Sequence, residues 1–143
     1  MWDQPATVLQ SAPTDSQQTR EILIIEDDQS QREVLSLRLC SQGFKTLEAS
    51  NAMDGLRLAE ERHPHLVLLD VRLPDIDGFR VCRHLDENPE TSKIPVIILS
   101  GMERPDIIRR ARRAGCHYFV RKPYDPNALL ILVEQAMMER RGE

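Results

Sequence analysis

Groups that could bind a metal ion or a phosphoryl group follow at least four of the five short apolar segments of this sequence. In chain order they are Glu26-Asp27-Asp28 after residues 22–25, Asp70 after residues 66–69, Ser100 after residues 96–99, and Arg121-Lys122-Pro123 after residues 118–120. In an open parallel sheet, the carboxyl ends of the strands border one crevice in which ligands bind. If the segments are strands of such a sheet, we expect these carboxylates, the hydroxyl and the ammonium group to meet there.

The acidic members of this group predict a metal site. Glu26, Asp27 and Asp70 would repel one another at close range, which raises carboxylate pKa values unless a cation compensates. Mg²⁺ suits this role because it prefers oxygen ligands and is commonly held by one or two carboxylates and a phosphate. A carboxylate beside Mg²⁺ can attack phosphorus and become an aspartyl phosphate. Lys122 and Ser100 would then stabilise the phosphoryl oxygens by charge and by hydrogen bonding.

The elements that must position these groups alternate in type along the chain. From residue 21 onward, each strand-like segment is followed by a pattern typical of a helix, and the strands are almost continuously apolar. Such strands indicate a parallel sheet that is buried on both faces, so we predict an α/β domain of five β-α units. The strands are expected at 22–25, 44–48, 66–69, 96–99 and 118–120, and the helices at about 30–42, 51–63, 79–85, 105–114 and 126–140.

Capping and turn residues mark several boundaries of these elements. Ser30-Gln31-Arg32-Glu33 fits a capping box, and Asn51 can cap the second helix. Asp28 suits a capping role as well as a role in the site. Pro74-Asp75-Ile76-Asp77-Gly78 predicts a turn, in which the proline fixes φ and Gly78 tolerates a positive φ.

Composition limits the kinds of partner. The chain has 143 residues, enough for one domain with a sizeable core, and a formal net charge of −4. That charge gives no electrostatic reason to expect nucleic acid as a partner. No apolar run approaches the ~20 residues that a membrane helix needs, so no membrane partner is expected. Residues 1–20 are rich in polar residues and proline, which predicts a flexible leader before a domain at 21–143.

The cysteines suggest a reducing environment. Cys40, Cys82 and Cys116 are an odd number at wide spacings, with no CxxC pair. This pattern favours neither a disulfide framework nor a zinc site. We therefore predict unpaired cysteines and a cytoplasmic location.

Four segments in order carry a family resemblance. They are ILIIEDD at 22–28, PHLVLLDVRLPDIDG at 64–78, IPVIILSG at 94–101 and AGCHYFVRKP at 114–123. With these segments, the sequence closely resembles the receiver domain of bacterial two-component response regulators, in its stand-alone, chemotaxis-regulator-like form. The resemblance spans about residues 21–140. It implies a flavodoxin-like fold with strand order 2-1-3-4-5, an order of which this family is itself a standard example.

The resemblance also implies roles for the residues around Asp70. Asp70 would accept a phosphoryl group from a histidine kinase or a phosphotransfer protein. Asp27, Asp70 and the backbone carbonyl of Arg72 would ligate Mg²⁺, while Glu26 would act through water. Arg72 and Met102 flank the expected route of the hydrolytic water, so we predict that their side chains set the lifetime of the phosphate.

A second set of implied residues would transmit the signal. Ser100 and Lys122 would contact the phosphoryl group, and Lys122–Pro123 is a candidate cis peptide. Movement of Ser100 would let Phe119 turn inward, whereas Tyr118 lies one position off the switch. This would change the surface formed by the fourth predicted helix, the fifth strand and the fifth helix, to which an effector or a second copy of the chain would bind.

Two features of that surface have alternative interpretations. Leu130, Ile131 and Met138 of the last helix are either left exposed for a partner or part of a broad core stripe. The arginine run of the fourth helix, at 109–113, either attracts an acidic partner or forms a solvated face.

Functions of other classes compete with the switch. Only residues 141–143 follow the last predicted helix, so no output domain is expected, and a switch would not be an enzyme in its own right. A Mg²⁺-dependent phosphohydrolase or nuclease could use a similar acidic crevice, with Asp75 and Asp77 imitating a nuclease pair. A third possibility is a docking module that resembles a receiver but is never phosphorylated.

Overall fold

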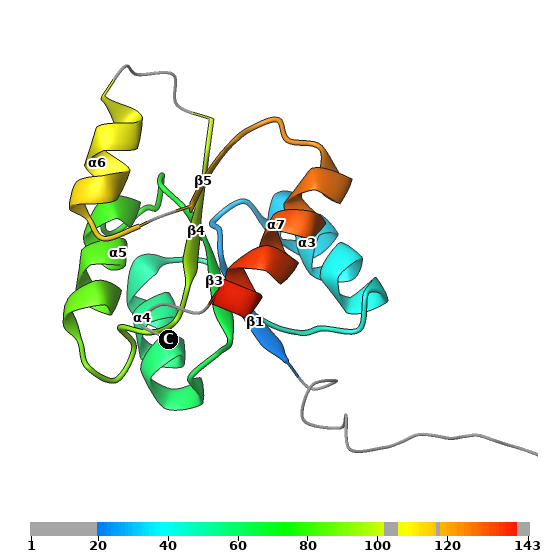
Figure 1. The fold of residues 1–143 in the computed structure, drawn as a ribbon, viewed down its shortest axis with the longest axis horizontal. Coiled ribbons are helices and arrows are strands. Elements are labelled where there is room, and N and C mark those ends of the chain that lie inside the picture. Colours follow the sequence, from blue (N-terminus) through cyan, green and yellow to red (C-terminus); the bar gives the residue numbers. More distant parts are fainter. Residues whose placement is uncertain (1–19, 102–105, 117, 140–143) are drawn as a thin grey trace, which may run out of the picture.

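Strands and helices alternate in five β-α pairs in the computed structural model, which describes residues 20–101, 106–116 and 118–139 (Figure 1). In chain order the elements are β1 (Glu21–Ile25), α3 (Gln29–Ser41), β2 (Lys45–Ala49), α4 (Ala52–Arg62), β3 (Leu66–Asp70), α5 (Gly78–Glu87), β4 (Val96–Ser100), α6 (Ile107–Arg113), β5 (Tyr118–Arg121) and α7 (Pro126–Glu139).

The strands form one parallel sheet in the order β2-β1-β3-β4-β5, which confirms the predicted fold class and strand order. β1 and β3 are neighbours in the sheet although β2 and α4 separate them along the chain, and Ile25 pairs with Leu69 at their carboxyl ends. The acidic residues at the carboxyl ends of these two strands are therefore brought side by side.

Helices cover both faces of the sheet. In Figure 1, α4, α5 and α6 lie on one side of the strands, and α3 and α7 lie on the other. Leu23 and Ile25 of β1 belong to the core on the first side, whereas Ile22 and Ile24 belong to the core on the second. Since successive side chains of a strand point to opposite faces, two packed faces explain why the central strands are apolar at consecutive positions.

The start of α3 differs from the prediction. Ser30 lies inside the helix, and Asp28 is the N-cap, with its Oδ1 atom accepting a hydrogen bond from the Gln31 N–H at 3.0 Å. The predicted capping box was therefore wrong, because an aspartate with extended backbone two residues earlier already satisfies the first turn. Asn51 caps α4 as predicted, by accepting a hydrogen bond from the Asp54 N–H at 2.8 Å.

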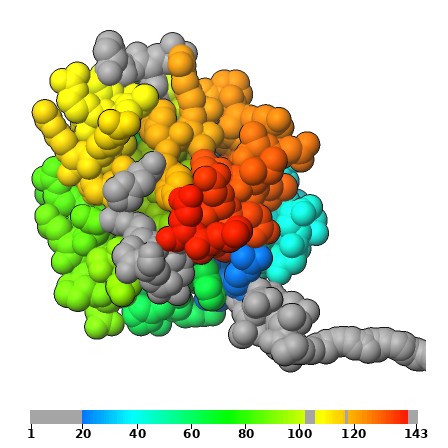
Figure 2. Space-filling model, viewed as in Figure 1, coloured from blue at the N-terminus to red at the C-terminus, as the bar shows by residue number. Residues whose placement is uncertain are grey.

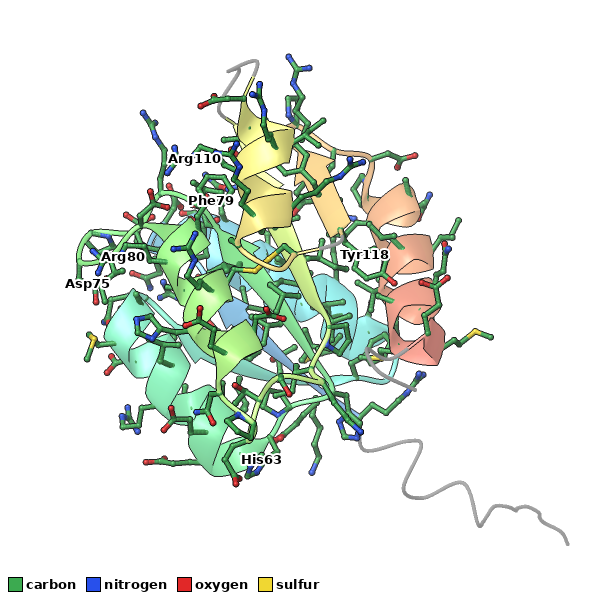
Figure 3. All side chains as sticks on the ribbon, turned by 60° about the vertical axis from the view of Figure 1, so that its left-hand side comes forward. His63, Asp75, Phe79, Arg80, Arg110 and Tyr118 are labelled. Atoms are coloured by element: carbon green, nitrogen blue, oxygen red, sulfur yellow. A yellow bond between two sulfur atoms is a disulfide. The ribbon has the colours of Figure 1, made fainter. Side chains whose placement is uncertain are left out.

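A disulfide joins two elements that are distant in sequence. It links Cys82 of α5 to Cys116, just before β5, with a Cα–Cα distance of 6.5 Å, and it is visible as the yellow bond in Figure 3. The prediction that the cysteines are unpaired was wrong, because the fold brings together two buried side chains that lie 34 residues apart. Cys40 is a free and exposed thiol.

The described part of the domain begins at Arg20. The rest of the predicted leader lies outside the described residues, but Arg20 contacts the second core: its guanidinium lies 5.0 Å from the centre of the Phe44 ring and 3.3 Å from the Glu134 carboxylate. Across the described ranges, none of the helices has both the length and the apolar character required to cross a membrane.

Candidate phosphoryl and metal site

A crevice of about 550 Å³ opens at the carboxyl ends of the strands. Residues that follow β1, β3, β4 and β5 line it, together with Gln31 from the first turn of α3. Glu26, Asp27, Asp70 and Lys122 all face this one space. The structure thus brings together the carboxylates and the ammonium group that the strand ends predicted.

Three carboxylates form the acidic part of the crevice. Glu26, Asp27 and Asp70 each place an oxygen atom so that the three atoms lie within 4.8 Å of one another. Glu26 and Asp70 are buried, whereas Asp27 is exposed. Closely spaced carboxylate oxygens are the ligand type that Mg²⁺ prefers, and an exposed member leaves room for water and a phosphate in the coordination shell.

Lys122 lies across the crevice from these acids. Its Nζ atom is 2.8 Å from Glu26 Oε1, 2.8 Å from Gln31 Oε1 and 3.7 Å from Asp70 Oδ2. The ammonium group therefore bonds directly to Glu26 and stands slightly beyond hydrogen-bonding distance from Asp70. A group held in this way can follow the oxygens of an incoming anion with a small side-chain movement.

The proximity of these groups shifts their pKa values. Burial raises the pKa of Glu26, and the negative charge of Asp70 adds to this effect, although the bond from Lys122 opposes it. Burial lowers the pKa of Lys122, but the bond to Glu26 and the charge of Asp70 outweigh burial, so that the pKa rises overall. Lys122 consequently remains a cation at neutral pH.

Close backbone packing fixes Asp70. Its Oδ1 atom accepts a hydrogen bond from the Arg72 N–H at 3.3 Å, and the Gly78 N–H donates to the Val71 carbonyl at 2.8 Å. A Cβ atom on Gly78 would lie 2.6 Å from both the Asp70 carbonyl oxygen and the Val71 Cα atom. Gly78 does not have a positive φ, contrary to the prediction; this position needs glycine because α5 begins against the backbone of β3.

The two aspartates of the turn after β3 cap two different helices. Asp75 accepts hydrogen bonds from the Ala52 and Met53 N–H groups at 2.8 and 3.0 Å, and these bonds lower its pKa. Asp77 accepts a hydrogen bond from the Phe79 N–H at 2.7 Å. Capping therefore explains both residues without a nuclease role.

The expected switch residues lie behind the crevice. Ser100 is buried at the end of β4, and its carbonyl oxygen accepts a hydrogen bond from the Lys122 N–H at 2.8 Å. Phe119 is half-buried and packs against the core beneath α4, α5 and α6. Tyr118 points to the opposite face and donates a hydrogen bond to Glu139 of α7 (Figure 3).

The remaining predictions for this region have different outcomes. The Lys122–Pro123 peptide is cis, as the resemblance implied. Arg72 lines the crevice, whereas Met102 lies outside the described residues. On α7, Leu130 is half-buried and packs against the core, whereas Ile131 and Met138 are 68% and 84% exposed and do not belong to the core stripe. The red end of α7 lies on the outer surface in Figure 2.

Known proteins share this arrangement. The signal receiver domain of a signal transduction histidine kinase from Syntrophus aciditrophicus is 30% identical and superimposes with a TM-score of 0.81, over 87% of this chain and 95% of that one. The polar-differentiation response regulator DivK of Brucella ovis is 30% identical over 105 residues, which cover 73% of this chain and 85% of DivK.

Longer relatives match as well. The transcriptional regulatory protein AfsQ1 of Streptomyces coelicolor is 36% identical over 122 residues, which cover 85% of this chain but only 52% of AfsQ1. The chain therefore spans about half the length of this relative. The model of the response regulator receiver domain matches residues 22–134, which include every group of the crevice. By this match and by its fold, the chain belongs to the response regulator receiver domain family.

Proposed function

We propose that this chain is a phosphorylation switch in which Asp70 accepts a phosphoryl group from a histidine kinase or a phosphotransfer protein. The observation that carries the proposal is the position of Asp70: its buried carboxylate lies 3.7 Å from the Lys122 ammonium group and shares an open crevice with Glu26 and Asp27. A nucleophile, a metal site and a cation for the phosphoryl oxygens are thus supplied by three strand ends.

The crevice suits Mg²⁺ by its donor set. Four carboxylates, of Glu26, Asp27, Asp28 and Asp70, and two cationic side chains, of Arg72 and Lys122, line the crevice, so a divalent cation would balance the local charge. Asp27, Asp70 and the backbone carbonyl of Arg72 would ligate the ion, and Glu26 would act through water. A bound Mg²⁺ would supply positive charge to the phosphoryl oxygens.

Phosphoryl transfer then needs little from the protein beyond positioning. An oxygen of the Asp70 carboxylate attacks the phosphorus atom, and the bond to the donor nitrogen breaks with its electron pair on that nitrogen. Lys122 stabilises the phosphoryl oxygens by its charge. The Arg72 N–H, which donates to Asp70 Oδ1, orients the carboxylate.

The new charge would be transmitted through Ser100 and Phe119. A phosphoryl group adds about −1.5 to −2 charge and strong acceptor oxygens, which would attract the Ser100 hydroxyl. Phe119 then turns toward the space that Ser100 leaves, and the surface formed by α6, β5 and α7 changes for an effector or a second copy. The exposed Ile131 and Met138 on α7 provide apolar area for that contact.

The experiment is phosphorylation by acetyl phosphate with and without Mg²⁺, scored by intact mass. The unsubstituted chain is expected to gain one phosphoryl adduct that requires Mg²⁺. Asp70→Asn is expected to gain none. Asp54→Asn, in a half-buried position on α4 outside the crevice, is the matched control and should be labelled as the unsubstituted chain is.

Two other results would redirect the assignment. A folded chain that binds Mg²⁺ but gains no adduct would favour a docking module that is never phosphorylated. Continuous release of phosphate from a phosphomonoester or a nucleic acid would favour the hydrolase.

A further inference from the structure

We propose that a pocket between α5 and α6 binds small phosphorylated anions, at a site separate from the crevice of Asp70. The pocket has a volume of about 200 Å³ and is lined by four arginines, Arg80 and Arg83 from α5 and Arg110 and Arg113 from α6, with Phe79 and Ala114. Figure 2 shows the surface of α6 (yellow) directly above that of α5 (green).

Fixed contacts hold the two walls of this arginine pocket. The Arg110 guanidinium lies 4.6 Å from the centre of the Phe79 ring (both labelled in Figure 3). It also lies 3.0 Å from Asp77 Oδ2, so it joins α6 to the start of α5. Farther along both helices, the Cys82–Cys116 disulfide joins α5 to the segment after α6. The pocket is therefore a preformed feature of the fold, since its walls are tied at two places.

The positive charge of the pocket is mostly uncompensated. Arg80, Arg83 and Arg113 are exposed, and none of them forms an ion pair with a residue in the described ranges 20–101, 106–116 and 118–139. Asp77 is already paired with Arg110, and Asp86 of α5 lies against Gly115. Like charges collected in one hollow attract an anion from solution.

The number and the kind of cations favour a phosphoryl group over a single carboxylate. A guanidinium group presents a planar fork of N–H donors that matches two oxygens of a phosphate, and several forks can share the oxygens of one tetrahedral anion. A carboxylate side chain of a protein partner would bring one charge and two oxygens to four guanidinium groups. A pyrophosphate or a phosphorylated metabolite fits this charge better.

The arginine pocket is separate from the crevice but connected to it. Asp77, the partner of Arg110, belongs to the turn that leads from Asp70 to α5. An anion that binds Arg110 would compete with Asp77 for the guanidinium group. Ligand binding at α5 and α6 would therefore act on the turn beside the phosphorylation site.

The test is an NMR titration of the isotope-labelled chain with sodium pyrophosphate and, separately, inorganic phosphate. The buffer contains EDTA and constant ionic strength, so that neither metal binding nor salt contributes. We expect saturable shifts of amides in α5 and α6. The double variant Arg83→Gln, Arg113→Gln should bind pyrophosphate about tenfold more weakly or worse.

The matched control is Arg109→Gln, Arg112→Gln, which removes two exposed arginines of α6 that do not line the pocket. It should bind within about twofold of the unsubstituted chain. Equal weakening by both double variants, shifts centred on Lys122, or no saturation would overturn the proposal. Tighter binding of a hexaglutamate peptide than of pyrophosphate would also overturn it, in favour of an acidic protein segment. Thermal unfolding of both variants confirms that they are folded.

Discussion

Gly78 determines how closely α5 can approach the phosphorylation site. We predict that Gly78→Ala lowers the free energy of unfolding by about 1–3 kcal/mol. The new methyl group would overlap backbone atoms, which cannot move aside as easily as a flexible side chain can. Labelling by acetyl phosphate should slow as well, since relief of the overlap displaces Asp70. Urea unfolding and the labelling rate measure the two effects.

The control for this substitution is Gly101→Ala. Among residues 20–101, 106–116 and 118–139, its Cβ atom would meet nothing closer than the Lys122 Cβ atom, at 4.0 Å. We expect its unfolding free energy to stay near that of the unsubstituted chain. If both variants lost the same stability, the cost would be a general effect of replacing glycine and the close approach would not explain it.

Asp75 should make stability depend on pH in the acid range. Hydrogen bonds from two N–H groups at the start of α4 lower its pKa in the folded chain. A carboxylate with a depressed pKa contributes stability above its unfolded pKa, and that contribution is lost as the pH falls through the folded pKa. Asp75→Asn should therefore be less stable than the unsubstituted chain near pH 7, and the difference should shrink below about pH 4. A difference in the free energy of unfolding between the two proteins that stays constant from pH 7 to pH 3 would contradict this.

The candidate site could be predicted largely from residue types at strand ends. Asp27, Asp70 and Lys122 meet because the sheet is parallel, and that followed from the apolar strands. The contacts of Asp75 and of Arg110 could not be predicted. Each joins residues 22 to 33 positions apart, and their distance depends on how the turn after β3 packs against two helices.

At the scale of elements, α3 presents an apolar surface next to the crevice. Val34 and Leu37 are 51% and 71% exposed on this helix, whose first turn contributes Gln31 to the crevice. A protein that delivers a phosphoryl group to Asp70 must cover the rim of the crevice, and α3 forms part of that rim. These two side chains are therefore well placed for contact with a donor protein.

We predict that Leu37→Asp slows phosphorylation of the chain by a protein donor but not by a small-molecule donor. Labelling by a phosphorylated histidine protein should slow about tenfold or more, the size expected when an apolar contact in an interface is lost. Labelling by acetyl phosphate should not change, because Leu37 does not line the crevice. Ile131→Asp, in an equally exposed apolar position on α7, is the control and should leave both rates unaltered. Equal slowing with both donors would indicate damage to the site instead.

The disulfide between α5 and the segment before β5 leads to a prediction about stability. Its half-cystines are 34 positions apart, and closing a loop of that length stabilises the folded chain by about 3–4 kcal/mol in the chain-entropy estimate. Reduction should lower the free energy of unfolding by that amount. Alkylation of the denatured, unreduced chain should modify one thiol, Cys40, and reduction should raise the count to the three cysteines of the sequence. Three modified thiols without reduction would show that the bond is absent.

The boundaries of the elements were predicted less well than their order. The strands and helices lie where the apolar pattern predicted them. However, α3 begins at Gln29, because Asp28 and not Ser30 is its N-cap. Both residues are good caps, and only the backbone conformation at the end of β1 decides between them. The disulfide between Cys82 and Cys116 was not predicted, because their separation along the sequence does not determine the distance between their side chains in the fold.

For the whole molecule, strand order decides where the chemistry lies. Because β1 and β3 are neighbours, the residues after them form one acidic site at the middle of the sheet edge. The order itself came from the family resemblance, since periodicity alone does not order parallel strands. The arginine pocket lies between α5 and α6, so one chain of net charge −4 carries two sites of opposite charge.

The bond between Cys82 and Cys116 also turns part of the chain into a closed covalent ring. β4 and α6 lie inside the ring, whereas Asp70 and Lys122 lie outside it, one on each side. A protease that cut between Arg112 and Arg113 would therefore produce two fragments that stay in one molecule. Such a nicked chain would migrate as intact protein until it is reduced, and Asp70 and Lys122 would remain together although they no longer share a continuous backbone.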